Sequence, residues 1–291
     1  MGYYADHGSA FVSLLMRSPS NLKNLLLYEF RWWRYLLAYP DTREAVITNV
    51  TKVITCGLSV RGKKVYCCSK EGCNHQKTIC FSCKSRFCPT CGAKATDNWV
   101  SKQMKRLPIC DWQHITFTMP SQFWSLFEKD RSLLAHLPRI AANILQKLAK
   151  AKGITLGIFV AIHTFGHDLG WKPHVHLSVT TGGLTQKNKW RDMYFAHKKL
   201  HNMWRYQIVT LFRKLRKEGQ IDLDPKTLTA QMERHWHIHL AEPTSDAARS
   251  VSYLGRYIQR PPVAMKRLLH YSGSDITFRY KDTKTGKHTD Q

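Results

Sequence analysis

The chain of 291 residues has few acidic side chains. Asp and Glu together number 20, whereas Lys and Arg number 45, which gives a formal net charge of +25. A balance this far from neutral exceeds what solubility requires, and it indicates a polyanionic partner such as a nucleic acid. A protein that is merely basic, such as a ribosomal protein, is the plainer alternative.

Long hydrophobic runs are missing as well. No stretch approaches the roughly 18 uninterrupted apolar residues of a membrane span, and the segment Met1–Asp6 lacks the basic-then-apolar pattern of a signal peptide. We therefore expect a cytoplasmic protein with no membrane partner. Internal repeats and low-complexity tracts are also lacking, and the length suits one or two domains.

Cysteine is nearly absent outside one segment, because eight of the nine cysteines lie between Cys56 and Cys91. In a reducing compartment such clustering indicates a bound metal ion rather than disulfides. A CxxC turn aims two thiolates at one point, and zinc prefers four thiolates in a tetrahedron. The spacing therefore predicts a structural Zn²⁺ in a zinc-ribbon-like module, with the preferred ligands Cys68, Cys73, Cys88 and Cys91.

The other cysteines of this segment leave the ligand set open. Cys83 and Cys56 are further candidate ligands, and a second zinc site or a different choice that includes Cys67 and Cys80 is also possible. Lysines surround the thiols, and Arg86 lies between Cys83 and Cys88. These cations predict that the module also contacts a phosphate backbone.

The order of the expected elements predicts an α+β fold. Apolar periodicity predicts helices within 8–50, 121–152, 189–218 and 245–259, and β-branched or aromatic runs predict strands at 114–120, 158–165, 174–180 and 236–240. A turn rich in Gly and Asp separates the second and third strands, so we expect an antiparallel hairpin there. The predicted parts are a helical segment at 1–50, a zinc-binding domain at 51–100 and a larger domain at 101–291.

Two histidines mark the expected hairpin as a metal site. Alternate residues of a strand point to one face, so His174 and His176 present their imidazoles together. His163 lies on the preceding strand, and the hairpin can bring it to the same metal. Three histidines leave positions for a phosphate oxygen and water, which suits Lewis-acid chemistry. The triplet His237–His239 repeats the pattern, and only the additional His163 favours the first pair.

Two tyrosines form the second candidate constellation. Tyr253 and Tyr257 are four residues apart near the end of a predicted helix, so both phenols share one face. A phenol, with a pKa of about 10, is a poor nucleophile unless cations favour its phenolate-like transition state. Arg256 and Arg260 are such cations. The alternative is an aromatic stripe that faces the core.

Taken together, these motifs resemble the two-tyrosine HUH transposases of rolling-circle insertion sequences, the IS91 type. The likeness covers residues 56–261 in the order of the family. Its motifs are Ser82-Cys83-Lys84-Ser85-Arg86-Phe87-Cys88-Pro89-Thr90-Cys91, His114-Ile115-Thr116-Phe117-Thr118-Met119-Pro120, Ile162-His163-Thr164-Phe165-Gly166, Pro173-His174-Val175-His176 and Tyr253-Leu254-Gly255-Arg256-Tyr257-Ile258-Gln259-Arg260-Pro261. The resemblance also assigns His237–His239 to a strand that leads into the tyrosine helix.

The resemblance implies a transposase with an HUH nuclease domain at 101–291. Such an enzyme nicks single-stranded DNA, forms a covalent 5′-phosphotyrosine and transfers the strand through the freed 3′-hydroxyl. Mg²⁺ or Mn²⁺ would bind the three histidines, and either tyrosine would attack. Arg86, Arg256 and Arg260 would contact DNA. Its place would be the bacterial cytoplasm, in association with the nucleoid.

Two other functions stay open at this point. The family normally continues beyond the end of this chain, which predicts a domain truncated at its C-terminal end. A truncated copy could be a catalytically inactive DNA-binding zinc protein. A rolling-circle replication initiator or relaxase would share the histidines and a tyrosine, but it normally lacks the upstream cysteine module.

Overall fold

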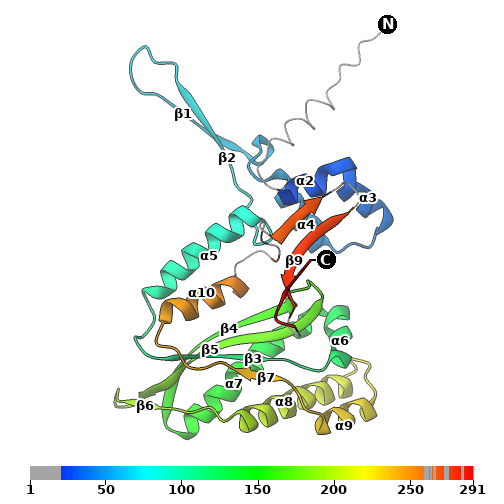
Figure 1. Cartoon of the computed structure of the whole chain (residues 1–291), viewed down its shortest axis with the longest axis vertical. Coiled ribbons are helices and arrows are strands. Elements are labelled where there is room, and N and C mark those ends of the chain that lie inside the picture. The colour runs from blue at the N-terminus through cyan, green and yellow to red at the C-terminus, as the bar shows by residue number, and fades with distance from the viewer. Residues whose placement is uncertain are drawn as a thin grey trace. The chain divides into compact units, whose positions relative to one another are not determined.

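The computed structural model describes residues 21–258, 262, 264, 267–271, 275–282 and 285–290. Among these residues, the side chains outside the described part are those of Asn21, Ala247, Leu254, Arg256, Tyr257, Ile258 and Tyr271. The chain divides into two compact units, one of residues 1–98 with 259–291 and one of residues 99–258 (Figure 1).

The first unit combines short helices with two small antiparallel sheets. Its helices are α2 (Asn21–Leu27), α3 (Arg31–Ala38), α4 (Glu44–Thr55) and the start of α5 (Pro89–Met104), with 3-10 turns at Tyr28–Phe30 and Ser59–Arg61. Strands β1 (Lys63–Cys67) and β2 (Gln76–Cys80) form a hairpin. Strands β8 (Leu268–Tyr271), β9 (Ile276–Lys281) and β10 (His288–Asp290) form a sheet of order β10-β9-β8.

The core of this unit is small and contains thiols. Leu22 of α2 and Val53 of α4 are buried together with Cys83 and Cys88, and other cysteines pack around them. The strands β1 and β2, by contrast, are exposed along almost their whole length. Buried thiols therefore take the place of a larger apolar core, as is usual in small domains that a metal ion stabilises.

The second unit is built on one antiparallel sheet of order β4-β5-β3-β7, with β6 paired to the far end of β5. Its strands are β3 (Trp112–Phe117), β4 (Ile154–Phe165), β5 (Trp171–Thr185), β6 (Trp190–Asp192) and β7 (Ile238–Leu240). Its helices are α6 (Trp124–Lys129), α7 (His136–Ala151), α8 (His197–Lys217), α9 (Pro225–Glu233) and α10 (Ala247–Ile258), with 3-10 turns at Ser121–Phe123 and Arg131–Ala135. The outer strand β4 has two register shifts against β5.

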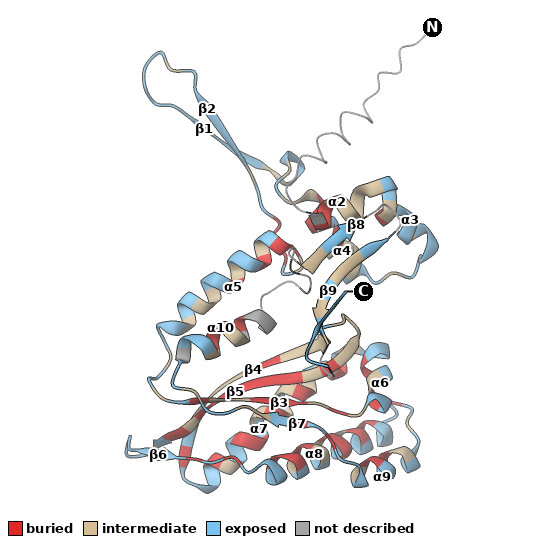
Figure 2. Ribbon diagram, in the orientation of Figure 1, coloured by how far each residue is buried: buried red, intermediate tan, exposed pale blue. Residues whose placement is uncertain are grey.

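Helices α7 and α8 cover one face of this sheet, and α10 lies on the other (Figure 1). The apolar residues of α8 recur at helical spacing, with Leu200, Trp204, Ile208 and Phe212 fully buried. They pack against the residues of β5 that point the same way, which include Val175, and much of β5 is buried (Figure 2). The main core therefore lies on one side of the sheet, and the opposite face carries polar side chains together with a few buried apolar residues such as Trp112 and Ala161.

The expected fold class is confirmed, because an antiparallel sheet carries flanking helices and the predicted β4–β5 hairpin forms. One expected helix, 189–218, begins later than predicted. Its first residues instead form β6, which pairs with Gly182–Leu184 after a turn at Asn188, whose φ is 55°. None of the helices in the described part of the chain has the length and apolar content that a bilayer crossing needs.

We expect Trp204→Ala to lower the free energy of unfolding by about 3–5 kcal/mol, because it opens a cavity between α8 and the sheet. Trp204 is 0% exposed, and its Nε1–H donates to the Thr118 carbonyl at 2.7 Å. The matched control is Tyr206→Ala on the same helix, where the ring is 56% exposed and the change should be within about 0.5 kcal/mol. Urea unfolding followed by near-ultraviolet circular dichroism measures both, and equal effects would contradict this packing.

Candidate functional site

The three predicted metal-binding histidines lie on one face of the central hairpin. Along β5, Val175 and Leu177 face the core, so His174 and His176 point to the opposite face. The register pairs His163 of β4 directly with His174 of β5. Strand alternation and the hairpin register therefore bring together the residues that the sequence predicted.

Their ring nitrogens converge on one point. His174 Nε2 lies 3.0 Å from His176 Nε2 and 3.3 Å from His163 Nδ1. The three candidate ligand atoms all lie within 4.8 Å of one another. His174 Nδ1–H donates to the Lys172 carbonyl at 2.6 Å, which fixes the tautomer and leaves the Nε2 lone pair directed at the cluster.

The electrostatics of the cluster favour neutral imidazoles. Burial lowers the pKa of His174 and, more strongly, that of His176, where the neighbouring His174 and His114 lower the pKa further. Neutral rings present lone pairs, and several lone pairs aimed at one point repel one another unless a cation lies between them. The donor set therefore fits a divalent cation held by nitrogen with positions left for oxygen ligands.

A fourth histidine belongs to this site, although the sequence predicted no role for it. His114 of β3 lies 3.1 Å from His176 Nδ1 through its Nε2 and 3.2 Å from Ser178 Oγ through its Nδ1. Burial, with a contribution from His239, lowers the pKa of His114 to about 4, so the ring is neutral near pH 7. His114 thus contacts the nitrogen of His176 that faces away from His174. Only the pairing of β3 with β5 brings His114 there. The motif His114–Pro120 alone gives no sign of its contact with His176.

Tyr253 of α10 lies over the same face of the sheet. Its ring centroid is 4.5 Å from that of His114 and 6.2 Å from that of His176, both in edge-on contact. At the start of the helix, the Arg249 backbone N–H donates to the Asp246 carboxylate at 2.8 Å, a contact typical of helix N-termini. One predicted nucleophile therefore lies beside the histidine cluster.

The other residues predicted around that tyrosine are described only in part. Tyr257 lies on α10 four residues after Tyr253, but its side chain lies outside the described residues, as does that of Arg256. Arg260 lies wholly outside them. The expectation that these three side chains serve the histidine cluster therefore stays a prediction.

The rival triplet His237–His239 lies apart from the converging nitrogens. Within the described part of the chain, neither group that could hold a metal ion includes these residues. Ile238 is buried in β7 and His239 is exposed, opposite Thr116 of β3. Ile238 and His239 therefore belong to β7 at the edge of the sheet, in the position that the family resemblance implied.

Four cysteines of the first unit form a second candidate metal site. The group consists of Cys56, Cys83, Cys88 and Cys91. Cys91 Sγ lies 3.7 Å from the sulfurs of Cys56 and Cys83, and Cys88 Sγ lies 3.8 Å from that of Cys56. Zinc with sulfurs at about 2.3 Å in a tetrahedron places them about 3.8 Å apart, so the spacing fits a tetrathiolate zinc site.

The surroundings of the four cysteine sulfurs suit a bound cation. Burial raises the pKa of the Cys83 and Cys88 thiols, so they become thiolates only when a cation compensates the charge. The Lys23 ammonium, itself buried, donates to the Cys56 carbonyl at 3.0 Å. A zinc ion with four thiolates carries a net charge of about −2, and this ammonium offsets part of it. With Cys83 and Cys88 buried and Cys56 and Cys91 partly buried, the group suits a structural zinc ion.

This quartet differs from the ligand set preferred from the sequence. Cys88 and Cys91 belong to both sets, but Cys68 and Cys73 lie in the loop between β1 and β2 and contact each other. Cys56 comes from the end of α4, and the backbone N–H of Cys83 donates to its sulfur at 3.3 Å. The preference for Cys68 and Cys73 came from spacing alone, which could not place the end of α4 beside the CxxC turn.

Arg86, the cation predicted to touch DNA from the zinc module, lies in the loop that joins Cys83 to Cys88 and is exposed. Two turns of this loop are held by sulfur and hydroxyl contacts, since the Ser85 N–H donates to Cys83 Sγ and the Phe87 N–H donates to Ser85 Oγ. The Arg86 side chain therefore extends from a loop whose backbone is held by contacts to Cys83 and Ser85.

Sequence comparisons agree with this arrangement. Residues 30–119 match the family model described as "Transposase zinc-binding domain", and residues 157–291 match the model described as "Putative transposase". The transposase for insertion sequence element IS801 of Pseudomonas savastanoi pv. phaseolicola is 40% identical over 281 residues, covering 92% of this chain and 68% of that protein. The chain belongs to the IS91-type transposase family.

Two further proteins were found at lower identity. The putative transposase y4qJ of Sinorhizobium fredii (strain NBRC 101917 / NGR234) is 24% identical over 280 residues, covering 87% of this chain and 69% of that protein. The solved metal-free structure of the conjugative relaxase TrwC in complex with oriT DNA aligns at 11% identity and a TM-score of 0.23, covering 49% of this chain and 70% of that chain. Membership of the family rests on the IS801 relative.

We expect Cys83→Ser to remove the zinc ion from the transposase, because a buried hydroxyl does not replace a thiolate ligand. Elemental analysis after dialysis against a weak chelator measures the metal content, and the thermal midpoint should fall with it. Cys110→Ser is the control, since Cys110 lies outside the quartet. Retention of the metal in Cys83→Ser together with its loss in Cys68→Ser would restore the ligand set preferred from spacing.

Proposed function

We propose that this transposase nicks single-stranded DNA by attack of Tyr253 on a phosphate beside the histidine cluster, and that it then transfers the strand. The observation that carries the proposal is the shared face: the nitrogens of His163, His174 and His176 converge, and the Tyr253 ring lies against His114 beside them. Family membership supports DNA as the substrate. Single-strand cutting is the step that this geometry suits.

The three histidines would hold Mg²⁺ or Mn²⁺, which would polarise the scissile phosphate as a Lewis acid. The proposal also gives the structural zinc to Cys56, Cys83, Cys88 and Cys91. Two observations support these assignments. His174 donates its Nδ1–H to the Lys172 carbonyl, so its Nε2 presents a lone pair to the cluster. The cysteine sulfurs have the spacing of a tetrahedron.

The covalent step needs no reactant besides the tyrosine, the DNA and water. The Tyr253 oxygen forms a bond to phosphorus while the bond from phosphorus to the 3′-oxygen breaks. The phenol proton leaves with water, and the departing strand takes up a proton as its 3′-hydroxyl. The product is a 5′-phosphotyrosine, and attack by a 3′-hydroxyl of another strand reverses the step and joins that strand.

His114 would act as a positioning residue between the two parts of the site. Its Nε2 meets Nδ1 of His176, and its ring meets the edge of Tyr253. The hydrogen bond orients the imidazole of His176, and the ring contact limits the positions open to the phenol. Tyr257, Arg256 and Arg260 follow on the same segment, and the proposal retains Tyr257 as a second nucleophile and the arginines as phosphate contacts.

We expect Tyr253→Phe combined with Tyr257→Phe to abolish the covalent adduct, because no phenol remains to attack phosphorus. The assay uses single-stranded oligonucleotides from element ends with Mn²⁺. A 3′-label should move to the wild-type protein on a denaturing gel, whereas a 5′-label should appear on the released strand. Each single variant shows how much cutting either tyrosine sustains.

Two outcomes contradict this assignment. An adduct that survives in the double variant would require another nucleophile. The absence of any adduct with wild-type protein, despite salt-dependent binding of the same oligonucleotides, would favour a DNA-binding zinc protein without catalysis.

We expect His174→Ala combined with His176→Ala to reduce cutting by at least about a hundredfold while DNA affinity changes little, since the imidazoles act on the phosphate through a bound cation. Titration with Mn²⁺ followed by electron paramagnetic resonance should show the loss of metal binding directly. His235→Ala is the matched control, because this exposed histidine lies outside the converging group. Equal loss of DNA binding and cutting would indicate a structural role for the hairpin instead.

A further inference from the structure

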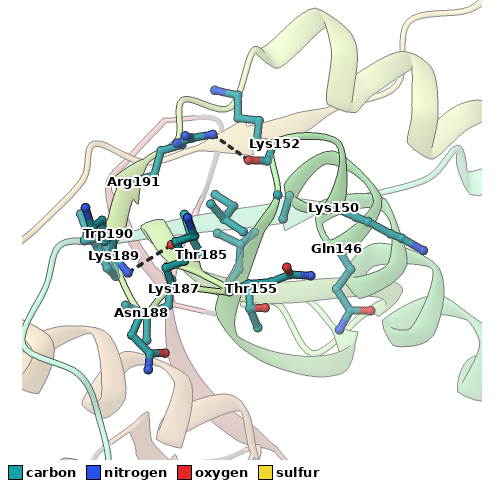
Figure 3. A pocket seen from close by; sticks show the side chains of 16 residues that line it. Gln146, Lys150, Lys152, Thr155, Thr185, Lys187, Asn188, Lys189, Trp190 and Arg191 are labelled. Carbon is teal, nitrogen blue, oxygen red and sulfur yellow. Dashed lines mark hydrogen bonds between the residues drawn. The ribbon is translucent and has the colours of Figure 1, made fainter.

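A second candidate site lies at the opposite end of the β4–β5 hairpin. A pocket of about 1230 Å³ opens between the end of α7, the start of β4, the end of β5 and the turn into β6 (Figure 3). From His163 to Ile154, β4 runs nine residues, which is about 30 Å at 3.3 Å per residue. The pocket is therefore separate from the histidine cluster.

The lining of this pocket is cationic. Lys150, Lys152, Lys187, Lys189 and Arg191 line it, and no Asp or Glu does. None of the five forms an ion pair among the described residues. Arg191 is instead fixed by the hydrogen bond from its Nη1 to the Lys152 carbonyl at 3.0 Å, which Figure 3 marks. A run of cations is often only a solvated face, but five cations around one concave surface, with the Asp192 carboxylate as the nearby counter-charge, still concentrate positive potential.

An exposed indole completes the pocket. Trp190 of β6 is 43% exposed, and its Nε1–H donates to Asp192 Oδ1 at 2.7 Å. The ring packs over Gly182 so closely that a Cβ there would lie 2.7 Å from ring carbons. Gly182 thus leaves room for the indole, and the hydrogen bond holds its orientation. A rigid, exposed aromatic ring among cations is the arrangement that stacks a base and neutralises its phosphates.

We infer that this pocket binds single-stranded DNA, with a base on Trp190 and phosphates on the surrounding lysines and Arg191. A duplex hides its base faces in the stack, so an indole platform favours an unpaired strand. At 3.4 Å per nucleotide, 30 Å corresponds to about nine nucleotides. The pocket would therefore grip the strand within about nine nucleotides of the cut phosphate, and that placement rests on the proposed function.

Fluorescence anisotropy with a labelled oligothymidylate of about 20 nucleotides tests the binding directly. We expect Lys187→Ala combined with Lys189→Ala to weaken binding and to reduce the slope of log affinity against log salt by about 1.4, or 0.7 for each lost phosphate contact. The matched control is Lys129→Ala combined with Lys226→Ala, which removes the same charge from exposed positions outside the pocket. Its slope should stay closer to that of the wild type.

The stacking contact has its own test. Trp190→Ala should weaken oligothymidylate binding about 5- to 100-fold, and Trp190→Phe should restore most of the loss because a phenyl ring still stacks. Equal thermal midpoints would exclude unfolding as the cause. Wild-type affinity in Trp190→Ala, or a slope change that the control variant matches, would overturn the inference. A duplex hairpin probe that loses as much affinity as oligothymidylate would overturn it too, in favour of a surface for double-stranded DNA.

The covalent assay separates this inference from the proposed function. With an element-end oligonucleotide too short to reach the pocket, Lys187→Ala with Lys189→Ala should form the adduct as well as wild type, and the defect should appear when the strand is extended. The lack of adduct in every protein would count against cutting by Tyr253, while the anisotropy result would still decide whether the pocket binds single strands.

Discussion

The alternation of side chains along β5 is the constraint on which the second unit depends. Val175 and Leu177 pack against α7 and α8, and His174 and His176 then have to face the other way. A shift by one residue would bury two imidazoles in the apolar core and expose the valine and leucine. The packing that stabilises the sheet thus also fixes the direction of the metal ligands, and folding and site geometry cannot be separated here.

The two candidate metal sites differ in how the chain builds them. The histidines stand on paired strands of a large sheet, so their spacing follows from register. The cysteines come from the end of α4, a short loop and the first turn of α5, and the unit around them has only small apolar clusters. A bound zinc ion therefore stabilises the first unit itself, whereas the histidine cluster sits on a sheet that apolar packing already holds.

The sequence predicted the histidine cluster well because its signal is local. A His-x-His triplet on a strand and one hairpin turn are enough to bring His163, His174 and His176 together. His114 was given no role, and Cys56 was only one of several candidate zinc ligands, because both depend on contacts between distant segments that periodicity and spacing do not encode. The pocket around Trp190 was missed for a similar reason: Lys189, Trp190 and Arg191 were assigned to a predicted helix, whereas pairing of Gly182–Leu184 with 190–192 makes that segment a strand.

The sheet of the second unit also has a consequence for solubility. Its outer strands are β4, which departs twice from regular register, and β7, which has only three residues. Irregular or very short borders offer few aligned amide and carbonyl groups to a strand from another molecule. The sheet is thereby guarded against forming continuous β-structure with other copies of the chain.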